Sequence, residues 1–213
     1  MKLEQIRIMI PDELIEYADH AEEFFDFLPN NQGLTEEFLY AHQHTQKETI
    51  GVYSTSDQKV GILDYCEEIC RLFSVLHGPL LIVARKGYAG RLYVATDRNL
   101  IIHEDAYAVA PKIEYAEQIN IDWFAQHYSI EFQANRTSTQ GIGDFPRERF
   151  KKMKIVIPKI EFQNELADIY KRRNTIVKQW RNLQNTIETS VDAIITRHTD
   201  GIYIEGSGEQ HWA

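Results

Sequence analysis

The sequence predicts an α+β fold: a compact mixed α/β domain with a short-stranded twisted sheet, followed by a long C-terminal coiled-coil helix. Four short β-prone runs lie between residues 80 and 110, separated by tight turn signals. Apolar residues at spacings of three and four indicate helices on either side of these runs. After residue 158 a heptad pattern continues for roughly 36 residues, which is typical of a coiled coil rather than of a globular helix.

Length and composition fit a folded protein of one ordinary domain with an appendage. The chain has 213 residues, of which 43% are hydrophobic and 26% are charged. No apolar run approaches the length that crosses a bilayer, and the first residues lack a basic region followed by an apolar one. We therefore expect a cytoplasmic protein with no membrane contact.

Charge is distributed unevenly along the chain. Residues 1–70 contain 15 Asp and Glu against 4 Lys and Arg, whereas residues 71–213 contain 17 against 19. The net charge of -9 is therefore concentrated near the N-terminus. A polyanion is expected to bind the later part of the chain, with the acidic part facing away from it or toward a protein partner.

The N-terminal part, residues 1–45, reads as helical and acidic. Within PDELIEYADHAEEFFDFL the apolar residues recur at helical spacing, at Leu14, Ile15, Ala18, Ala21, Phe25 and Leu28. PNNQG then breaks the pattern, and TEEFLYAH is expected to form a second short helix that Thr35 caps.

The middle of the chain changes to short strands. LLIVA (80–84), RLYVA (91–95), NLIIH (99–103) and AYAVA (106–110) predict one compact sheet with tight connections. INIDWFAQHYSIEF (119–132) returns to helical spacing, and NRTSTQGIGDF (135–145) has the composition of a loop. FPRERFKK is expected to form a single helical turn, and MKIVIP a strand that stops at Pro158.

The C-terminal segment carries a heptad seam. Its positions alternate spacings of four and three, and the apolar ones are assigned to helix pairing: Phe162, Leu166, Ile169, Ile176, Trp180, Leu183, Ile187 and Ile194. Arg173 and Ser190 interrupt the seam and are suited to fixing its register. A helix lying across its own domain explains the first turns only, so a partner helix is the better interpretation. The predicted division is a domain at 1–157, this helix at 158–198 and a tail at 199–213, with Arg197, His198 and Gly201 marking the helix end.

No catalytic, cofactor or metal constellation stands out, and we expect no enzyme activity, cofactor or metal. Cys66 and Cys70 are best read as reduced thiols packed as small apolar groups. KGYAG, residues 86–90, has only a G-x-x-G spacing, which indicates a tight turn more than a cofactor loop.

Features suited to nucleic-acid contact recur instead. One glycine turn gathers basic and aromatic residues, the following loop combines guanidinium, amide and hydroxyl groups, and a third cluster is strongly basic. The candidates in these three clusters are Arg85, Lys86, Tyr88, Arg91; Arg136, Thr137, Ser138, Thr139, Gln140; Arg147, Arg149, Lys151, Lys152.

Taken in order, these pieces resemble a known family, the DNA specificity (S) subunits of type I restriction-modification systems. The resemblance is carried by VYSTS with GIL (52–63), LLIVARKGYAGRLYV (80–94), AVAPK (108–112), TSTQGIGDF (137–145) and IVIPKIEFQNELADI (155–169). It covers roughly residues 48–195, as one target-recognition domain followed by one spacer helix. The resemblance adds Ser54, Thr55 and Ser56 to the DNA-binding candidates.

The resemblance implies a non-catalytic reader of one half of a split double-stranded DNA target. It implies docking to modification (methyltransferase) and restriction subunits, and a homodimer through the C-terminal helix that rebuilds the family's two-domain arrangement. The acidic N-terminal residues and the single recognition domain depart from the family pattern. Two alternatives stay open: the recognition domain of a fused restriction-methyltransferase, and a coiled-coil adaptor without a DNA role.

Overall fold

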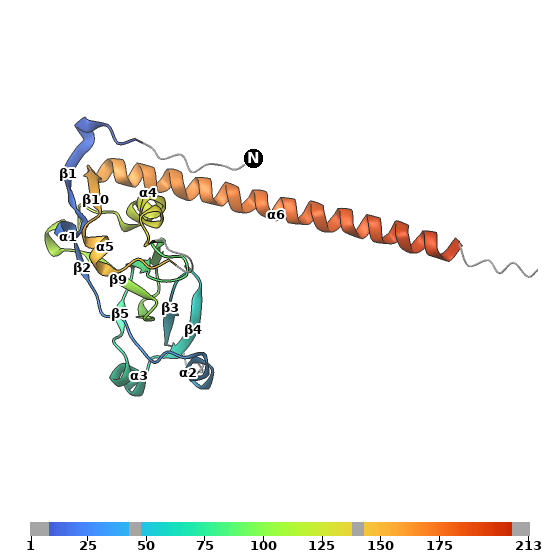
Figure 1. Ribbon diagram of the computed structural model, residues 1–213, viewed down its shortest axis with the longest axis horizontal. Coiled ribbons are helices and arrows are strands. Elements are labelled where there is room, and N and C mark those ends of the chain that lie inside the picture. The colour runs from blue at the N-terminus through green and yellow to red at the C-terminus, as the bar shows by residue number, and fades with distance from the viewer. Residues whose placement is uncertain (1–8, 43–47, 138–142, 206–213) are drawn as a thin grey trace, which may run out of the picture. The chain divides into compact units, whose positions relative to one another are not determined.

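The computed structural model describes residues 9–42, 48–137 and 143–205, with side chains described as far as residue 196. The chain divides into two compact units, Met1–Ala167 and Asp168–Ala213. The described strands all belong to the first unit, called here the sheet unit (Figure 1). The described part of the second unit is the greater part of one long helix.

The first four-stranded sheet has the order β2-β9-β6-β7. Its strands are β2 (Phe25–Phe27), β6 (Leu80–Ala84), β7 (Leu92–Ala95) and β9 (Ala106–Pro111), and all of its pairings are antiparallel. Every residue of β6 is buried, as expected for a central strand with both faces covered.

The second four-stranded sheet has the order β4-β3-β8-β5. It consists of β3 (Thr49–Tyr53), β4 (Lys59–Asp64), β5 (Leu76–His77) and β8 (Asn99–Ile102), with β3 and β8 parallel. Two short helices accompany it, α2 (Glu36–Ala41) and α3 (Glu67–Leu72). The sequence predicted one sheet from the four runs, which is wrong for NLIIH. Its strand β8 pairs with β3 and β5 in the second sheet, because Ile101 and Leu100 find their pairing partners there.

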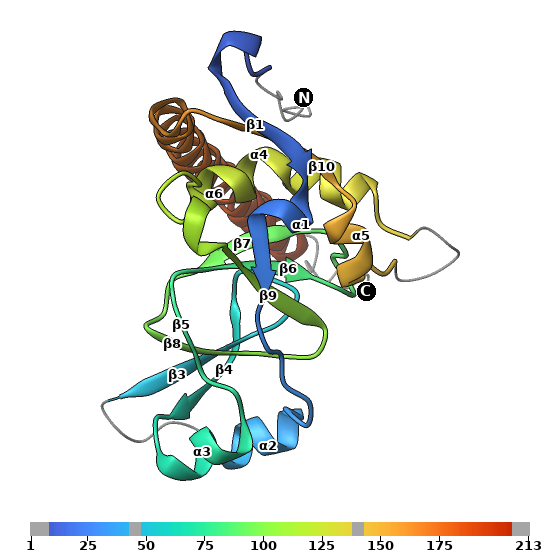
Figure 2. The ribbon, with the colours of Figure 1, turned by 90° about the vertical axis from the view of Figure 1, so that its left-hand side faces the viewer.

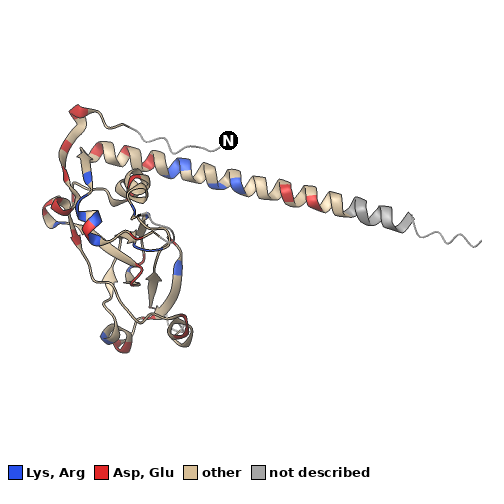
Figure 3. Ribbon diagram, viewed as in Figure 1, with Lys and Arg blue, Asp and Glu red and all other residues tan. Residues whose placement is uncertain are grey.

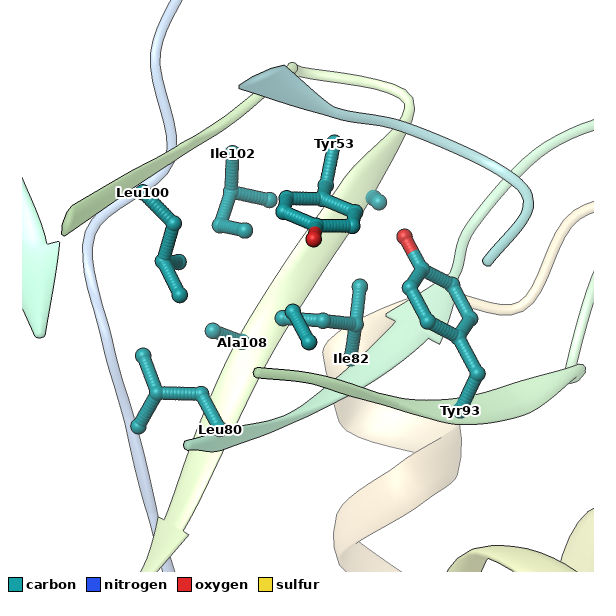
Figure 4. Packing of buried hydrophobic residues seen from close by; sticks show 9 residues of the cluster. Tyr53, Leu80, Ile82, Tyr93, Leu100, Ile102 and Ala108 are labelled. Carbon is teal, nitrogen blue, oxygen red and sulfur yellow. The ribbon is translucent and has the colours of Figure 1, made fainter. Parts of the chain in front are cut away.

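The two sheets share an apolar interior. Tyr53, Leu100 and Ile102 come from the second sheet, and Leu80 and Ile82 come from the first (Figure 4). Tyr93 and Ala108 complete the layer, and these side chains are at most 7% exposed. Strands β6 and β7, which flank the candidate turn at 85–91, both contribute side chains to this interior.

An aromatic cluster surrounds helix α4 (Ile121–Ala134), which packs on β6 and β7. Asn120 caps this helix, because its side chain accepts a hydrogen bond from the Trp123 backbone N–H. The rings of Phe124 and Phe132 contact those of Phe25 and Phe150. Phe150 lies in helix α5 (Arg147–Lys151), so this cluster connects α5 to the sheet unit. The helix predicted at 119–132 and the single turn at 145–152 are confirmed.

The N-terminal region differs from its prediction. Residues 12–27 form a 3₁₀ turn (Asp12–Leu14), strand β1 (Ile15–His20), a four-residue helix α1 (Ala21–Phe24) and strand β2. The helical prediction for residues 1–45 is therefore wrong across this stretch. β1 pairs antiparallel with β10 (Lys154–Pro158), from Ile15 opposite Pro158 to His20 opposite Lys154 (Figure 2). Pairing with a strand over 130 residues away overrides the local helical spacing. The short helix capped by Thr35 is confirmed, since the Thr35 side chain accepts from the Phe38 N–H at 3.1 Å.

The long helix is confirmed as α6 (Ile160–Glu205). It begins directly after β10, and at about 1.5 Å per residue its 46 residues span about 69 Å. It continues through Gly201, whereas an end near His198 was predicted. One glycine costs about 1 kcal/mol in a helix and does not by itself end a long one. The tail from residue 206 onward lies outside the described residues.

Gln163 fixes the start of α6 within the sheet unit. Its side chain is fully buried. The amide Nε2 donates to the carbonyls of Gln118 (2.7 Å) and Pro158 (2.6 Å), while Oε1 accepts from the Asn120 N–H at 2.9 Å. Three backbone groups from two connections are thus satisfied by one side chain, which joins the start of α6 to the start of α4.

Candidate nucleic-acid interface

The turn between β6 and β7, residues 85–91, depends on its glycines. Gly87 and Gly90 have φ of 65° and 82°, in the left-handed region that favours glycine. A Cβ on Gly90 would lie 2.5 Å from the Phe132 carbonyl oxygen. The interpretation of KGYAG as a tight turn is therefore confirmed, and α4 packs closely against it. Tyr88 at the tip is 59% exposed.

Each basic side chain of this turn pairs with an aspartate from a different connection. Arg85 Nε lies 3.4 Å from Asp144 Oδ1, and Lys86 Nζ lies 3.2 Å from Asp105 Oδ1. Arg91 Nη2 lies 3.2 Å from Asp57 Oδ1 and its guanidinium covers the Tyr88 ring. All six side chains are partly exposed, so each pair adds little to the stability of the fold.

Backbone hydrogen bonds tie these connections together. The N–H groups of Arg85 and Lys86 both donate to the Asp105 carbonyl, at 2.8 and 3.2 Å. The Phe145 N–H donates to the Arg85 carbonyl at 2.8 Å. The turn at 85–91, the turn at 103–105 and the end of the 135–145 loop therefore form one group of loops, called here the loop cluster.

The hairpin between β3 and β4 joins the loop cluster through Arg91 and Asp57. Thr55 and Ser56 are partly exposed, whereas Ser54 is 9% exposed. The Ser54 carbonyl accepts a 2.7 Å hydrogen bond from the Tyr93 hydroxyl. Burial, followed by the nearby Tyr53 and Asp57, raises the Tyr93 pKa well above its ordinary value. Tyr93 therefore remains a neutral donor that fixes the base of this hairpin.

The 135–145 connection enters the loop cluster through its two ends. Thr137 and Asp144 form a bridge in which the Thr137 N–H donates to the Asp144 carbonyl at 2.8 Å. Arg136 is exposed beside it. The Tyr107 hydroxyl donates to the Phe145 carbonyl at 3.3 Å, and burial raises the pKa of this tyrosine as well. The candidates Ser138, Thr139 and Gln140 lie outside the described residues.

The basic residues of α5 already contact their own domain. Arg147 donates to the Leu28 carbonyl at 3.2 Å, and its guanidinium lies over the rings of Phe27 and Tyr107. Arg149 donates to the Asn135 carbonyl at 2.6 Å, and Lys151 pairs with Glu148. The Lys151 ammonium lowers the pKa of the Glu148 carboxyl, chiefly through this hydrogen bond. Lys152, which follows the helix, is exposed. The third basic cluster therefore adjoins the loop cluster through Asn135, with Arg147 serving largely as a structural residue.

The seam residues of α6 fall into two groups. Leu166 is buried and Phe162 is half-buried, both within the sheet unit. The other six are between 50% and 64% exposed: Ile169, Ile176, Trp180, Leu183, Ile187 and Ile194. Large apolar side chains at this exposure on one helix indicate an interaction surface.

Other classes of site receive no support from the described residues. Within the described ranges, no three or more His, Cys, Asp and Glu side chains come close enough to hold a metal ion. Among the described helices, none combines the length and the apolarity that a membrane span requires. Cys66, at the cap of α3, and Cys70, within α3, are both free thiols. Cys66 is half-buried against the core, whereas Cys70 is exposed, so the expected packing as a small apolar group is wrong for Cys70.

Sequence reasoning missed the acidic and aromatic members of the loop cluster. Asp57, Asp105 and Asp144 each lie in a turn signal of the sequence, yet nothing local indicates which cation each one pairs with. Tyr93 and Tyr107 read as ordinary strand residues, and only their position in the sheet makes them donors to the loops.

Comparison with known proteins agrees with the expected fold. No known protein-family profile matches the sequence, and no curated protein matches it. Among solved structures, the type I restriction-modification S subunit from M. genitalium matches with a TM-score of 0.54 and 13% identity. A chain from a study of complex assembly and conformational transition of the type I system matches with a TM-score of 0.62 and 12% identity. The HsdS subunit from Thermoanaerobacter tengcongensis matches with a TM-score of 0.53 and 11% identity.

These matches cover 87%, 84% and 79% of this chain, in the same order, but 45%, 43% and 39% of the solved chains. The chain thus spans less than half the length of the proteins that it resembles. The resemblance expected from the sequence is confirmed at the level of the fold: this chain has the fold of one target-recognition domain and long helix of a type I restriction-modification S subunit.

Proposed function

We propose that this chain is a DNA specificity subunit of a type I restriction-modification system that reads one half of a split target. The observation that carries the proposal is the loop cluster. It gathers Arg85, Lys86 and Arg91 near the partly exposed residues Thr55 and Ser56, on a fold shared with S subunits. Lysine and arginine would supply salt-dependent affinity for phosphates, and base edges would supply the sequence choice.

Two exposed basic residues, one in the loop cluster and one beside it, suit different tasks. Arg136 is exposed beside the Thr137–Asp144 bridge, so its guanidinium is free to pair with a guanine edge in a major groove. Lys152 is exposed just after α5 and is suited to a phosphate as a point charge. We assign base reading to the loop around Arg136 and backbone contact to the basic residues around α5.

The proposal includes partners but no chemistry in this chain. Methyl transfer and cleavage would be carried out by modification and restriction subunits docked on it in the cytoplasm. The exposed apolar face of α6 would pair with a second copy, so that two recognition domains read a palindromic split site.

Binding to a randomised half-site duplex tests the DNA-reading part, using the full chain alone and together with a modification subunit. We expect Arg136→Ala to change the preferred bases and Lys152→Ala to weaken binding to all sequences about equally. The matched control is Arg71→Ala on α3, at the far end of the sheet unit from α5 (Figures 1 and 2), which should change neither. Unchanged preference in Arg136→Ala with altered preference in Lys152→Ala would contradict the assignment. An adaptor without a DNA role would show no steep loss of duplex binding between low and moderate salt.

A further inference from the structure

Most edge strands of the sheet unit are short or have their outward backbone groups satisfied. β2 and β5 contain only three and two residues. On β10 the Tyr128 hydroxyl donates to the Val156 carbonyl and accepts from the Val156 N–H, both at 2.7 Å. On β7 the Leu92 N–H donates to the Ser129 hydroxyl of α4 at 3.1 Å. Features of this kind prevent another chain from adding a strand at a sheet edge.

Of the two remaining edges, β1 is protected by charge and β4 is not. Glu16 and Asp19 are exposed within β1. β4, the six-residue edge of the second sheet (Figure 1), has charges only at its ends, Lys59 and Asp64. Lys59 Nζ lies 2.9 Å from Asp97 Oδ2, so this lysine is paired within its own domain. β4 is therefore the least protected edge among the described strands.

The pairing of β4 with β3 shows which backbone groups of β4 point outward. The Tyr65 N–H donates to the Glu48 carbonyl at 3.0 Å, and hydrogen-bonded pairs alternate with non-bonded pairs along an antiparallel ladder. In the register of these strands Leu63 belongs to the hydrogen-bonded set and Ile62 does not. The Ile62 N–H and C=O therefore point away from β3. Among the described residues, no hydrogen bond to either group is found.

The side chains of β4 add apolar surface to this edge. Ile62 is 37% exposed and Val60 is 49% exposed. On the opposite face of the strand, Leu39 of α2 packs over Gly61, where an added Cβ would lie 3.0 Å from Leu39 Cδ2. A bulge at Val60 ends the regular ladder at that end. The edge at 61–64 thus combines unpaired backbone groups with an exposed apolar side chain.

The charges that follow β4 are mainly acidic (Figure 3). Asp64 ends the strand, and α3 begins directly after it with Glu67 and Glu68. The one cation of α3, Arg71, already pairs with Glu67. α2 likewise begins with two glutamates. A chain that ran antiparallel to β4 would place its first residues beside Asp64, where a lysine or arginine is favoured.

A second copy of β4 would match this edge poorly. The outward groups of Ile62 would bond to those of Ile62 in the other copy, about a two-fold axis. That register places the Asp64 carboxylate of each copy opposite Val60 of the other, so a charge faces an apolar side chain twice. A segment of a different protein with a cation opposite Asp64 avoids both contacts.

We propose that the edge of β4 binds an extended segment of another protein as a fifth, antiparallel strand of the second sheet. The segment carries a lysine or arginine opposite Asp64 and apolar β-branched residues at the next two alternate positions, opposite Ile62 and near Val60. Main-chain hydrogen bonds to Ile62 supply affinity, and the alternate side chains supply specificity. This site goes beyond the proposed function, because it requires neither DNA nor pairing of α6.

A peptide titration of the isotope-labelled full chain tests the site. The probe is acetyl-KTVTV-amide, which aligns its lysine with Asp64 and its first valine with Ile62 in the antiparallel register. We expect the amide NMR signals of residues 59–65 to shift and to saturate with a Kd of about 1 mM or below. At a peptide concentration of about ten times Kd, the Ile62 amide should exchange with solvent about tenfold more slowly than without peptide.

Two modified peptides separate strand addition from loose apolar contact. N-methylation of the first valine removes the donor to the Ile62 carbonyl and should weaken binding about tenfold. Acetyl-ETVTV-amide reverses the charge opposite Asp64 and should bind about threefold more weakly. Equal binding by the N-methylated peptide would overturn the proposal. So would signal shifts that map to β1, β7 or β10, or the lack of saturation at about 10 mM peptide.

Substitutions at residue 62 provide the matching test in the protein. Ile62→Pro deletes the outward N–H without removing a bond of the β3–β4 ladder, and it should abolish binding of the peptide. Ile62→Lys places a cation on the edge and should weaken binding about tenfold, which keeps the test decisive if the proline variant does not fold. Ile130→Lys changes an isoleucine of α4 that is 40% exposed and should leave binding unchanged. Equal effects of the two lysine variants would contradict a site at β4.

Light scattering distinguishes a different partner from a second copy of this chain. We expect the parent chain and Ile62→Lys to have the same mass in solution. A lower mass for Ile62→Lys would assign the β4 edge to self-association and would overturn the proposal. DNA reading is decided separately by the duplex assay, so failure of the peptide site and failure of the proposed function are distinguishable.

Discussion

The loop cluster and the exposed face of α6 both present side chains to solvent, but they differ in what already holds those side chains. In the loop cluster each basic residue of the 85–91 turn has an aspartate partner, and backbone hydrogen bonds join three connections. On α6, from Ile169 onward, the apolar residues of the seam are half exposed or more. The hydroxyls of Thr175, Thr186 and Thr189 there bond to the carbonyl four residues earlier.

The difference indicates two kinds of surface. The loop cluster is organised before any ligand arrives, so a polyanion would find its contacts already placed and lose little ordering entropy. The face of α6 gains most of its stability only when something covers it, because helices in proteins derive stability chiefly from packing of an apolar face. In the proposed function the first surface would contact DNA and the second would pair with another chain.

The largest expected effect comes from the buried start of α6, set against the exposed remainder of the same helix. Gln163→Leu would leave the Asn120 N–H and the carbonyls of Gln118 and Pro158 buried without their partner. We expect a loss of about 3 kcal/mol in the free energy of unfolding of the sheet unit, measured by urea denaturation. Gln184→Ala, the same residue type on the exposed part of α6, should cost less than about 0.5 kcal/mol. Similar losses for the two variants would contradict the contrast between the regions.

A pair of glycine substitutions tests how rigidly the 85–91 turn is built. Gly90→Ala requires a left-handed residue whose Cβ would lie 2.5 Å from the Phe132 carbonyl, so the turn or α4 must shift. We expect it to cost about 2 to 3 kcal/mol. Gly87→Ala meets only the strain of its φ, because its nearest neighbours, atoms of Thr55, lie at 3.7 Å or more. It should cost about 1 kcal/mol, and thermal unfolding of both variants gives the comparison.

The sequence predicted the features that depend on local pattern. The long C-terminal helix, the helix that Thr35 caps, the helix at 119–132 and the runs that became β6, β7 and β9 all reflect periodicity or turn chemistry within a few residues. The failures share a different cause. β1 forms because the strand at 154–158 pairs with it, and β8 belongs to the second sheet because it pairs with β3. Neither pairing can be predicted from the residues next to β1 or β8 in the sequence.

The same distinction applies to the candidate site. Composition identified the cations of the loop cluster, since Arg and Lys beside glycines are apparent in the sequence. The ion pairing of these cations was not apparent from the sequence. Their partners Asp57, Asp105 and Asp144 lie in connections up to about 59 residues away along the chain. Arg147 shows the limit most clearly: it reads as a basic surface residue, yet it contacts Leu28, Phe27 and Tyr107.

A smaller effect is expected from the hydroxyl that fixes the β3–β4 hairpin. Tyr93→Phe removes the donor to the Ser54 carbonyl and leaves the ring in place. The buried carbonyl then lacks this bond, at a cost of about 1 to 2 kcal/mol in the free energy of unfolding. Faster amide hydrogen exchange should appear in residues 54–58 and not in α6. Uniform faster exchange would show that the hydroxyl stabilises the whole unit rather than the hairpin.

The smallest expected effect concerns one ion pair of the loop cluster, that of Lys86 with Asp105. Lys86→Ala removes a cation and should weaken duplex binding by about threefold to tenfold, with a salt slope lower by about one. Asp105→Asn keeps the size of its partner but removes the charge that competes with a phosphate for Lys86, so it should strengthen binding by a similar factor at low salt. The backbone carbonyl of Asp105 still accepts from Arg85 and Lys86, so the turn should remain in place.

Asp192→Asn on α6 removes the same charge outside the loop cluster and serves as the control for net charge. If all three variants changed affinity only as their net charge changes, the organised ion pairs of the loop cluster would have no part in DNA reading. Opposite effects of Lys86→Ala and Asp105→Asn, with Asp192→Asn near the parent chain, would show that the aspartates restrain the cations until a phosphate replaces them.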